Sequence, residues 1–123
     1  MTKAGAIYKF WSQFLTAYEE NTVPKDAEMP YITYNFVTDN FSGESVSMSA
    51  SLWYFSDSWK EINAKTEEIS EAIGMGGVFL ETEKGGSIWL KRGQPFAQNM
   101  SDEQSDQIRR KLINVVADYL TFD

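Results

Sequence analysis

Apolar residues near the N-terminus recur with the period of an α-helix. Within residues 4–20 they are spaced i, i+4, i+7, i+8 and i+11, which places them on one side of a helix. The pattern predicts a helix over residues 4–20, followed by an extended connector over residues 21–30, which hold two prolines. The expected buried stripe consists of Ile7, Trp11, Phe14, Leu15 and Tyr18.

Alternation of residue types then predicts two strands. The run Tyr31–Asp39 is rich in aromatic and β-branched residues, and Glu44–Phe55 alternates between apolar residues and serine. Turn-forming residues at 40–43 separate the two runs, so a long antiparallel hairpin is expected. The side chains expected on the core face are Ile32, Tyr34 and Phe36 in the first run, and Val46, Met48, Ala50, Leu52 and Tyr54 in the second.

A second helix is predicted after Ser58. Ser58 and Glu61 have the spacing of a capping box, and Gly74 is a typical helix stop. The acidic residues of this segment lie mainly off the apolar stripe, and we interpret them as a solvated face. The expected buried stripe is Trp59, Ile62, Thr66, Ile69 and Ile73.

The C-terminal third gives weaker signals. The runs Gly77–Thr82 and Ser87–Arg92 predict a short hairpin. We expect residues 93–101 to be irregular and Ser101–Gln104 to cap a short helical turn. The last segment, Ile108–Phe122, fits the period of a helix and that of a strand equally well.

The order of these elements indicates an α+β fold. We predict a mostly antiparallel sheet of about five strands with two main helices packed on it, in the order α-β-β-α-β-β followed by the ambiguous segment. The length of 123 residues fits a single domain over residues 1–123. A content of 42% hydrophobic and 15% aromatic residues supplies enough apolar surface for a core.

The residue types that are missing from the chain exclude several kinds of binding and catalytic site. The chain has no cysteine and no histidine, which excludes disulfides, thiolate zinc sites, imidazole ligands and a Ser-His-Asp triad. Gly74–Gly77 lacks the spacing of a phosphate-binding loop and is interpreted as a helix stop. The acidic residues Asp102, Glu103 and Asp106 are interpreted as helix capping rather than a calcium loop. We therefore predict no catalytic residue, metal site or cofactor.

The formal charge of −7 disfavours non-specific binding to DNA and to anionic membranes. No run of 18 apolar residues occurs, so no membrane-spanning helix is expected. The N-terminal residues lack the features of a signal peptide, which favours a cytosolic or assembly-borne protein.

Two features are candidate interfaces. Trp53 lies on the serine side of its strand, so that face is expected to be covered or to contact a subunit. Five of the eleven basic residues fall in two clusters, which are open to interpretation as a DNA contact, a partner surface or a solvated face. The candidate interface residues are Trp53, Lys91, Arg92, Arg109, Arg110 and Lys111.

Several segments, in matching order from about Val23 to Thr121, resemble one family. They are Val23–Ala27 leading into Pro30–Tyr34, Leu52–Trp59, Glu67–Ser70, Trp89–Gln98 and Ile108–Val115. The chain resembles the tail terminator, or tail completion, proteins of long-tailed bacteriophages and prophages. No single motif among these segments is a catalytic signature, and the resemblance rests on their number and order.

The resemblance implies a small α+β subunit that forms a ring, commonly a hexamer, which caps the tail tube and joins it to the head. It implies a homo-oligomer whose partners are the tail tube protein and a head-completion protein, without a cofactor and without specific nucleic-acid binding. It places the protein in the virion tail, and in the bacterial cytoplasm during assembly. It also favours a strand for Leu112–Thr121. It transfers no interface residue.

Three alternatives remain open from the sequence. The first is another head–tail joining protein, such as a head-closure subunit. The second is a nucleic-acid-binding accessory protein that uses Lys91, Arg92 and the cluster Arg109–Lys111. The third is a hydrolase based on carboxylates, which would need a concave pocket with strongly perturbed acidic groups.

Overall fold

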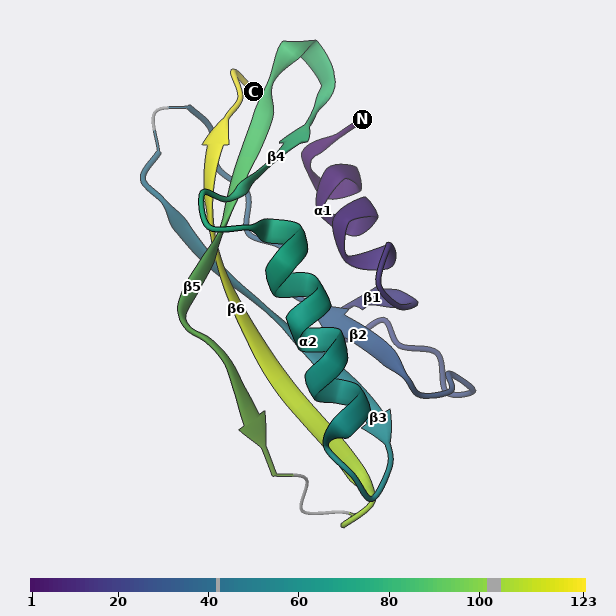
Figure 1. Ribbon diagram of the computed structural model, residues 1–123. Coiled ribbons are helices and arrows are strands. Elements are labelled where there is room, and N and C mark those ends of the chain that lie inside the picture. The colour runs from purple at the N-terminus through teal and green to yellow at the C-terminus, as the bar shows by residue number, and fades with distance from the viewer. Residues whose placement is uncertain (42, 102–104) are drawn as a thin grey trace.

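The computed structural model describes residues 1–41, 43–101 and 105–123, and over these residues the fold is α+β. Two α-helices pack on a six-stranded sheet of order β1-β2-β3-β6-β5-β4 (Figure 1). The elements are α1 (Lys3–Ser12), β1 (Ala17–Glu19), β2 (Tyr31–Tyr34), β3 (Val46–Phe55), α2 (Lys60–Ile73), β4 (Val78–Glu81), a short 3₁₀ turn (Glu83–Gly85), β5 (Ser87–Met100) and β6 (Ile108–Leu120).

The sheet is mixed, but only one neighbouring pair is parallel. Strands β1 and β2 run parallel, and the other four pairs of neighbours are antiparallel. The longest continuous register joins β3 to β6, from Val46 opposite Ala117 to Phe55 opposite Ile108. This arrangement confirms the predicted α+β class and a mostly antiparallel sheet, with one strand more than expected.

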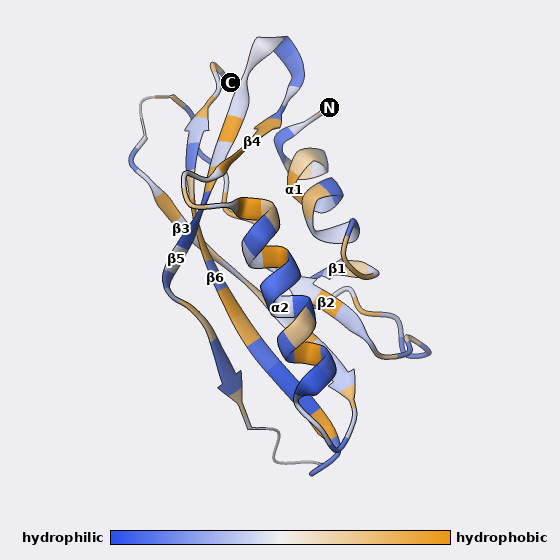
Figure 2. Ribbon diagram, in the orientation of Figure 1, coloured by the Kyte–Doolittle hydropathy of each residue, from blue (hydrophilic) through white to orange (hydrophobic). Residues whose placement is uncertain are grey.

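Both helices lie on the same face of the sheet, which we call the covered face (Figure 1). The core fills the space between them, because α2 turns its apolar stripe inward and the strands alternate between hydrophobic and hydrophilic positions (Figure 2). Leu52 of β3 and Ile113 of β6 are fully buried there, as are Ile62 and Ile69 of α2. The predicted core positions of β3 and α2 are therefore largely correct.

The predicted first helix was too long. Helix α1 ends at Ser12, and Ala17–Glu19 forms the strand β1 instead. The helical spacing continued past the end of α1 because Phe14 is also buried, with its ring edge-on to Phe10 at 5.3 Å. Apolar periodicity alone does not distinguish a longer helix from a shorter helix followed by a buried residue, because both give the same apolar pattern. At the other end, the Thr2 hydroxyl accepts a hydrogen bond from the Gly5 amide at 3.0 Å and caps the helix.

Two other expectations near α2 and β2 need correction. Strand β2 ends at Tyr34 rather than Asp39, and β3 begins at Val46. The capping box at Ser58 does not form: α2 begins at Lys60, and the Ser58 hydroxyl accepts a hydrogen bond from the Lys60 amide at 3.1 Å. The predicted stop is confirmed, because Gly74 follows α2 with a φ of 78°, which favours glycine.

The segment predicted to be irregular is part of a long strand. Strand β5 continues to Met100, with a break in register between Arg92 and Ala97 where it pairs with β6. Gly93 lies so close to Asn114 that a Cβ would stand 3.0 Å from the Asn114 backbone, which explains why a bulge with glycine occurs here. The last segment is a strand, β6, as the family resemblance implied. Of the predicted cap at 101–104, residues 102–104 lie outside the described residues.

Candidate functional site

The face of the sheet opposite the helices, which we call the open face, carries a row of aromatic residues. No helix or strand of the described chain packs over it. Tyr18 of β1 lies 5.8 Å from Tyr31 of β2, and Tyr31 lies 6.4 Å from Trp53 of β3, measured between ring centroids. Arg110 of β6 places its guanidinium 4.8 Å from the Trp53 ring centroid. Because each residue comes from a neighbouring strand, the row crosses the sheet.

Hydrogen bonds hold this aromatic row in position. The Trp53 indole donates to the Thr33 hydroxyl at 2.9 Å, and the Arg110 Nε donates to the Ser51 hydroxyl at 3.1 Å. The Arg110 and Trp53 side chains lie beside Ser51, whose exposed fraction is only 5%. The row is thus a fixed aromatic and cationic surface on an otherwise serine-rich face, and such surfaces are enriched in protein interfaces.

The other half of the open face carries an ion pair. Lys91 of β5 donates to Asp118 of β6 at 2.6 Å, and its ammonium stands 4.3 Å from the centroid of the Trp89 ring. The hydrogen bonds from Lys91 and then from Ser45 lower the pKa of the Asp118 carboxyl below its ordinary value. Phe79 of β4 stacks on Trp89 at 5.6 Å and is itself exposed. Lys91 is therefore neutralised within the chain.

The covered face bears three further cations beside α2, which we call the cation seam: Arg92, Arg109 and Lys111. Arg92 donates to the Ser70 hydroxyl at 2.8 Å, and Lys111 donates to the Asn63 side-chain oxygen. Arg109 lies over the Trp59 ring at 5.4 Å and donates to the backbone oxygen of Asp57 at 3.0 Å.

The groups that hold the cation seam are all neutral. Within the described parts of the chain, no carboxylate lies at ion-pair distance from any of its three members. The Arg109 Nε, which is buried, has no hydrogen-bond partner among the same residues. Burial lowers the pKa of Lys111, as expected for a cation that loses water without gaining an anion. The seam therefore offers positive charge to a ligand or partner.

The fold separates the predicted basic cluster. Arg109 and Lys111 point to the covered face and Arg110 to the open face, because successive side chains of a strand alternate between faces. The side chains of residues 109–111 therefore do not form one continuous basic patch. Trp53 and Arg110, in contrast, are neighbours on paired strands. Sequence reasoning missed Tyr18 and Tyr31 as members of the aromatic row, because Tyr18 was placed in a helix.

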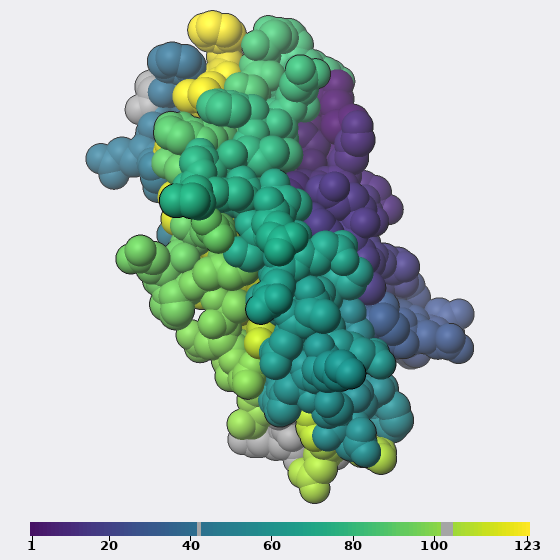
Figure 3. Space-filling model, in the orientation of Figure 1, coloured from purple at the N-terminus to yellow at the C-terminus, as the bar shows by residue number. Residues whose placement is uncertain are grey.

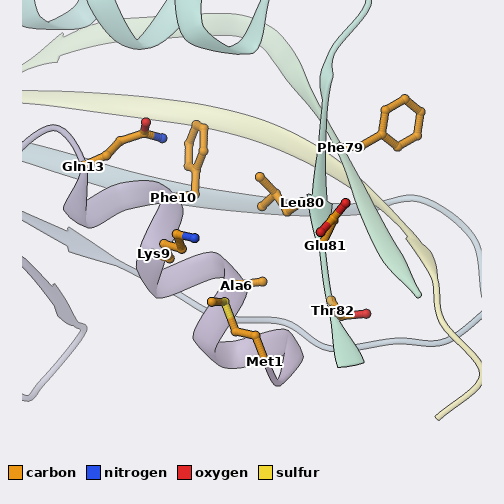
Figure 4. Close-up of a pocket in the computed structure, with 9 residues that line it drawn as sticks. All are labelled: Met1, Ala6, Lys9, Phe10, Gln13, Phe79, Leu80, Glu81 and Thr82. Carbon is orange, nitrogen blue, oxygen red and sulfur yellow. The ribbon is translucent and has the colours of Figure 1, made fainter. Parts of the chain in front are cut away.

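A hollow of about 420 Å³ lies between α1 and β4 (Figure 4). Ala6, Phe10 and Leu80 form its apolar lining, and Lys9 and Glu81 bring opposite charges to its rim. Phe79 points away from α1 (Figure 4). Such a lining suits an apolar group rather than acid–base chemistry.

A second, more open hollow of about 620 Å³ lies between the end of α2 and the bulge of β5. It includes Arg92 of the cation seam, next to Ser70 and Phe96. Figure 3 shows α2 and β5 side by side on this flank of the molecule. The hollow thus connects the cation seam with the outer edge of the sheet.

Two other kinds of site are absent from the described residues. No group of three or more acidic residues is placed to hold a metal ion in the parts of the chain that the structure covers. Nor does any described helix have the length and apolar character needed to cross a membrane. Of the predicted acidic cluster, Asp102 and Glu103 lie outside the described residues, and Asp106 contributes its backbone oxygen to Arg109.

No protein-family model matches the chain, and a search of curated proteins finds no match.

Proposed function

We propose that this protein is a structural assembly protein that works by self-association, as a tail terminator of a long-tailed bacteriophage or prophage. In this role it forms a ring, with six subunits as the expected number, that caps the tail tube and joins it to the head. The proposal rests on the sequence resemblance and on one structural observation. The helices cover one face of the sheet, whereas the other face presents the aromatic row of Tyr18, Tyr31, Trp53 and Arg110.

Contact chemistry accounts for this surface better than catalysis does. Tryptophan, tyrosine and arginine are the residues that contribute most to binding at protein interfaces. Here Trp53 is held by a hydrogen bond to Thr33 and Arg110 by one to Ser51, so these two side chains would lose little rotamer freedom on association. A surface that is ordered before binding suits a subunit that assembles on a template.

The formal charge of −7 supports the same role. A ring through which DNA passes must release the DNA, and a negatively charged wall repels phosphates. We expect the isolated ring to bind duplex DNA weakly. Tight binding with a steep dependence on salt concentration, measured by fluorescence anisotropy, would contradict this part of the proposal.

The direct test is the solution mass over a range of concentrations, alone and with the tail tube protein of the same genome. We expect a closed ring, either alone or on the tube, and Trp53→Ala is expected to weaken it at least tenfold. The matched control is Ser47→Ala, which changes an exposed residue of the same strand face. Binding to portal-side proteins instead of the tube would assign the chain to head closure. A monomer that binds neither partner would contradict both roles.

A further inference from the structure

We propose that subunits join head to tail. The acidic segment 19–28, which links β1 to β2, would dock in one copy on the outer edge of β5 and on the cation seam of the next copy. This inference rests on the proposed ring and names two surfaces that would meet in it in addition to the aromatic row. The partner is therefore a second copy of this chain. Three observations, on the sheet edge, the cations and the acidic segment, carry the inference.

The first observation is that most of β5 has no strand neighbour on its outer side within the described residues. Strand β4 pairs only with Ser87–Leu90, and beyond Leu90 the strand is bonded to β6 alone. The bulge and Pro95 protect residues 93–96 from pairing, since proline has no N–H to donate. The last four residues, Ala97–Met100, stay available for an extended segment, and Gln98 and Asn99 are exposed there.

The second observation is the arrangement of the cation seam, which has Arg92 on β5 and Arg109 and Lys111 on the neighbouring strand β6. Its neutral partners include Trp59, the N-cap residue of α2, and Asn63 and Ser70 within α2. They are spaced i, i+4 and i+11 and so lie on one side of the helix. Arg109, Lys111 and Arg92 consequently form a line beside α2. Fixed, half-buried cations that lack a carboxylate partner in their own chain are stabilised most by binding an anion of another molecule.

The third observation is an acidic segment at the opposite edge of the sheet, which we call the acidic connector, residues 19–28. It carries four exposed carboxylates and one exposed cation, Lys25, and none of these charges is ion-paired within the described residues. A turn closes its tip, where the Ala27 amide donates to the Pro24 oxygen at 3.1 Å. The carboxylates are Glu19, Glu20, Asp26 and Glu28.

The placement of the two surfaces gives the contact its direction. The acidic connector follows β1 at one edge of the sheet, and β5 reaches the other edge (Figures 1 and 3). The connector of one copy therefore cannot bind the cation seam of the same copy. Joining unlike surfaces of identical chains makes a heterologous contact, which closes into a ring when the rotation between copies allows it. Nucleic acid is a poorer occupant, because the exposed Glu67 and Glu71 of α2 would repel a continuous row of phosphates.

The absence of native cysteine allows a position-specific test in the full chain. We would mix Asp26→Cys protein with Gln98→Cys protein, oxidise the mixture and measure the disulfide-linked heterodimer. The control mixture replaces Gln98→Cys with Lys84→Cys, which is equally exposed but lies in the turn before β5. We expect at least a fivefold higher yield for the 26–98 pair. Equal yields at every protein concentration would overturn the inference.

Charge exchange provides an independent second measurement. Reversal of the connector in Asp26→Lys/Glu28→Lys, or of the seam in Lys111→Glu, is expected to abolish association of each variant alone. A mixture of the two variants is expected to recover it, because each reversed surface then meets an opposite charge. Lys25→Glu, which makes the connector more acidic, is the matched control and should strengthen association. Loss of association in the mixture as well would count against the inference.

The outcomes separate this contact from the proposed function. Rings that form without a preferred 26–98 disulfide and that tolerate both reversals would leave the terminator role standing and refute this interface. A preferred disulfide in chains that never close into a ring would support the contact and refute the terminator role.

Discussion

The two faces of the sheet use the same strands for different purposes. On the covered face, Leu52 and Ile113 are fully buried beneath the helices, and their role is to stabilise the fold. On the open face, Trp53 and Arg110 are only half-buried and are held by hydrogen bonds to Thr33 and Ser51. The buried apolar packing that stabilises the fold is concentrated on the covered face, whereas the open face presents ordered aromatic and cationic side chains of the kind found in interfaces.

Strand β6 shows the same contrast within two consecutive residues. Tyr119 points into the covered face with an exposed fraction of 3%, and its hydroxyl donates to the Val37 backbone oxygen. Asp118 points to the open face and accepts from Lys91.

The covered face should be the more sensitive to loss of side-chain volume. Leu52→Ala removes a fully buried side chain, so we expect the free energy of unfolding to fall by about 3 kcal/mol, within the range of buried leucine substitutions. Urea denaturation measures the change. Ser47→Ala, at an exposed position of the same strand, should alter stability by less than about 0.5 kcal/mol. Similar losses for both variants would contradict the division between faces.

The covered face should also set the alkaline limit of stability. Burial, with a smaller effect from Asp39, raises the pKa of Tyr119 to about 12, against about 10 in the unfolded chain. A raised pKa in the folded state means that this stability is present below about pH 10 and is lost as the pH rises toward about 12. The expected loss is on the order of 2 kcal/mol.

Tyr119→Phe separates this effect from the other tyrosines, because it has no group to titrate. The variant should lose stability at neutral pH, since it lacks the hydrogen bond to Val37, but it should lose less between about pH 9 and about pH 12. Denaturation curves at each pH give the slope. An unchanged alkaline slope would show that Tyr119 is not the group responsible.

The open face should respond more weakly to a larger truncation. Trp53→Ala removes the hydrogen bond to Thr33 and the ring beneath Arg110, and we expect the free energy of unfolding to fall by about 1.5 kcal/mol. Trp53→Phe keeps a ring but not the N–H, so it should recover more than half of that loss. A loss from Trp53→Ala as large as that from Leu52→Ala would mean that the open face carries core-like packing.

The sequence predicted the covered face much better than the open one. Alternation placed Met48, Leu52 and Tyr54 in the core because burial leaves a period of two in the residue types. It failed at Tyr18, where a buried Phe14 continued the helical spacing beyond the end of α1. Secondary structure that depends on pairing with a distant strand, as β1 does with β2, leaves no local signal.

The candidate interfaces were predicted only in part, for a similar reason. Trp53 was identified because it interrupts a row of serines, which is visible in the sequence. The separation of Arg110 from Arg109 and Lys111 depends on the strand assignment of the last segment, where periodicity was ambiguous. The line of cations along α2 could not be inferred at all, because it joins Arg92 and Lys111 through partners 22 and 48 residues away in the chain.

The smallest effect should come from the ion pair on the open face, and it should appear at acid pH. The hydrogen bond from Lys91, and then that from Ser45, lower the pKa of Asp118 in the folded state. A lowered pKa means that this stability is present above the unfolded pKa of about 4 and is lost as the pH falls through the folded value. Asp118→Asn should therefore cost about 1 kcal/mol at pH 7 and progressively less below about pH 4.

A double-mutant cycle with Lys91→Met isolates this pair from the contact between Lys91 and Trp89, because that contact is lost equally with Asp118 or Asn at position 118. We expect a coupling of about 1 kcal/mol at pH 7 that disappears at low pH. Strictly additive losses at pH 7 would show that the pair contributes nothing. The open face would then be stabilised by its aromatic contacts and its hydrogen bonds to Thr33 and Ser51, and acid sensitivity would have to arise elsewhere in the fold.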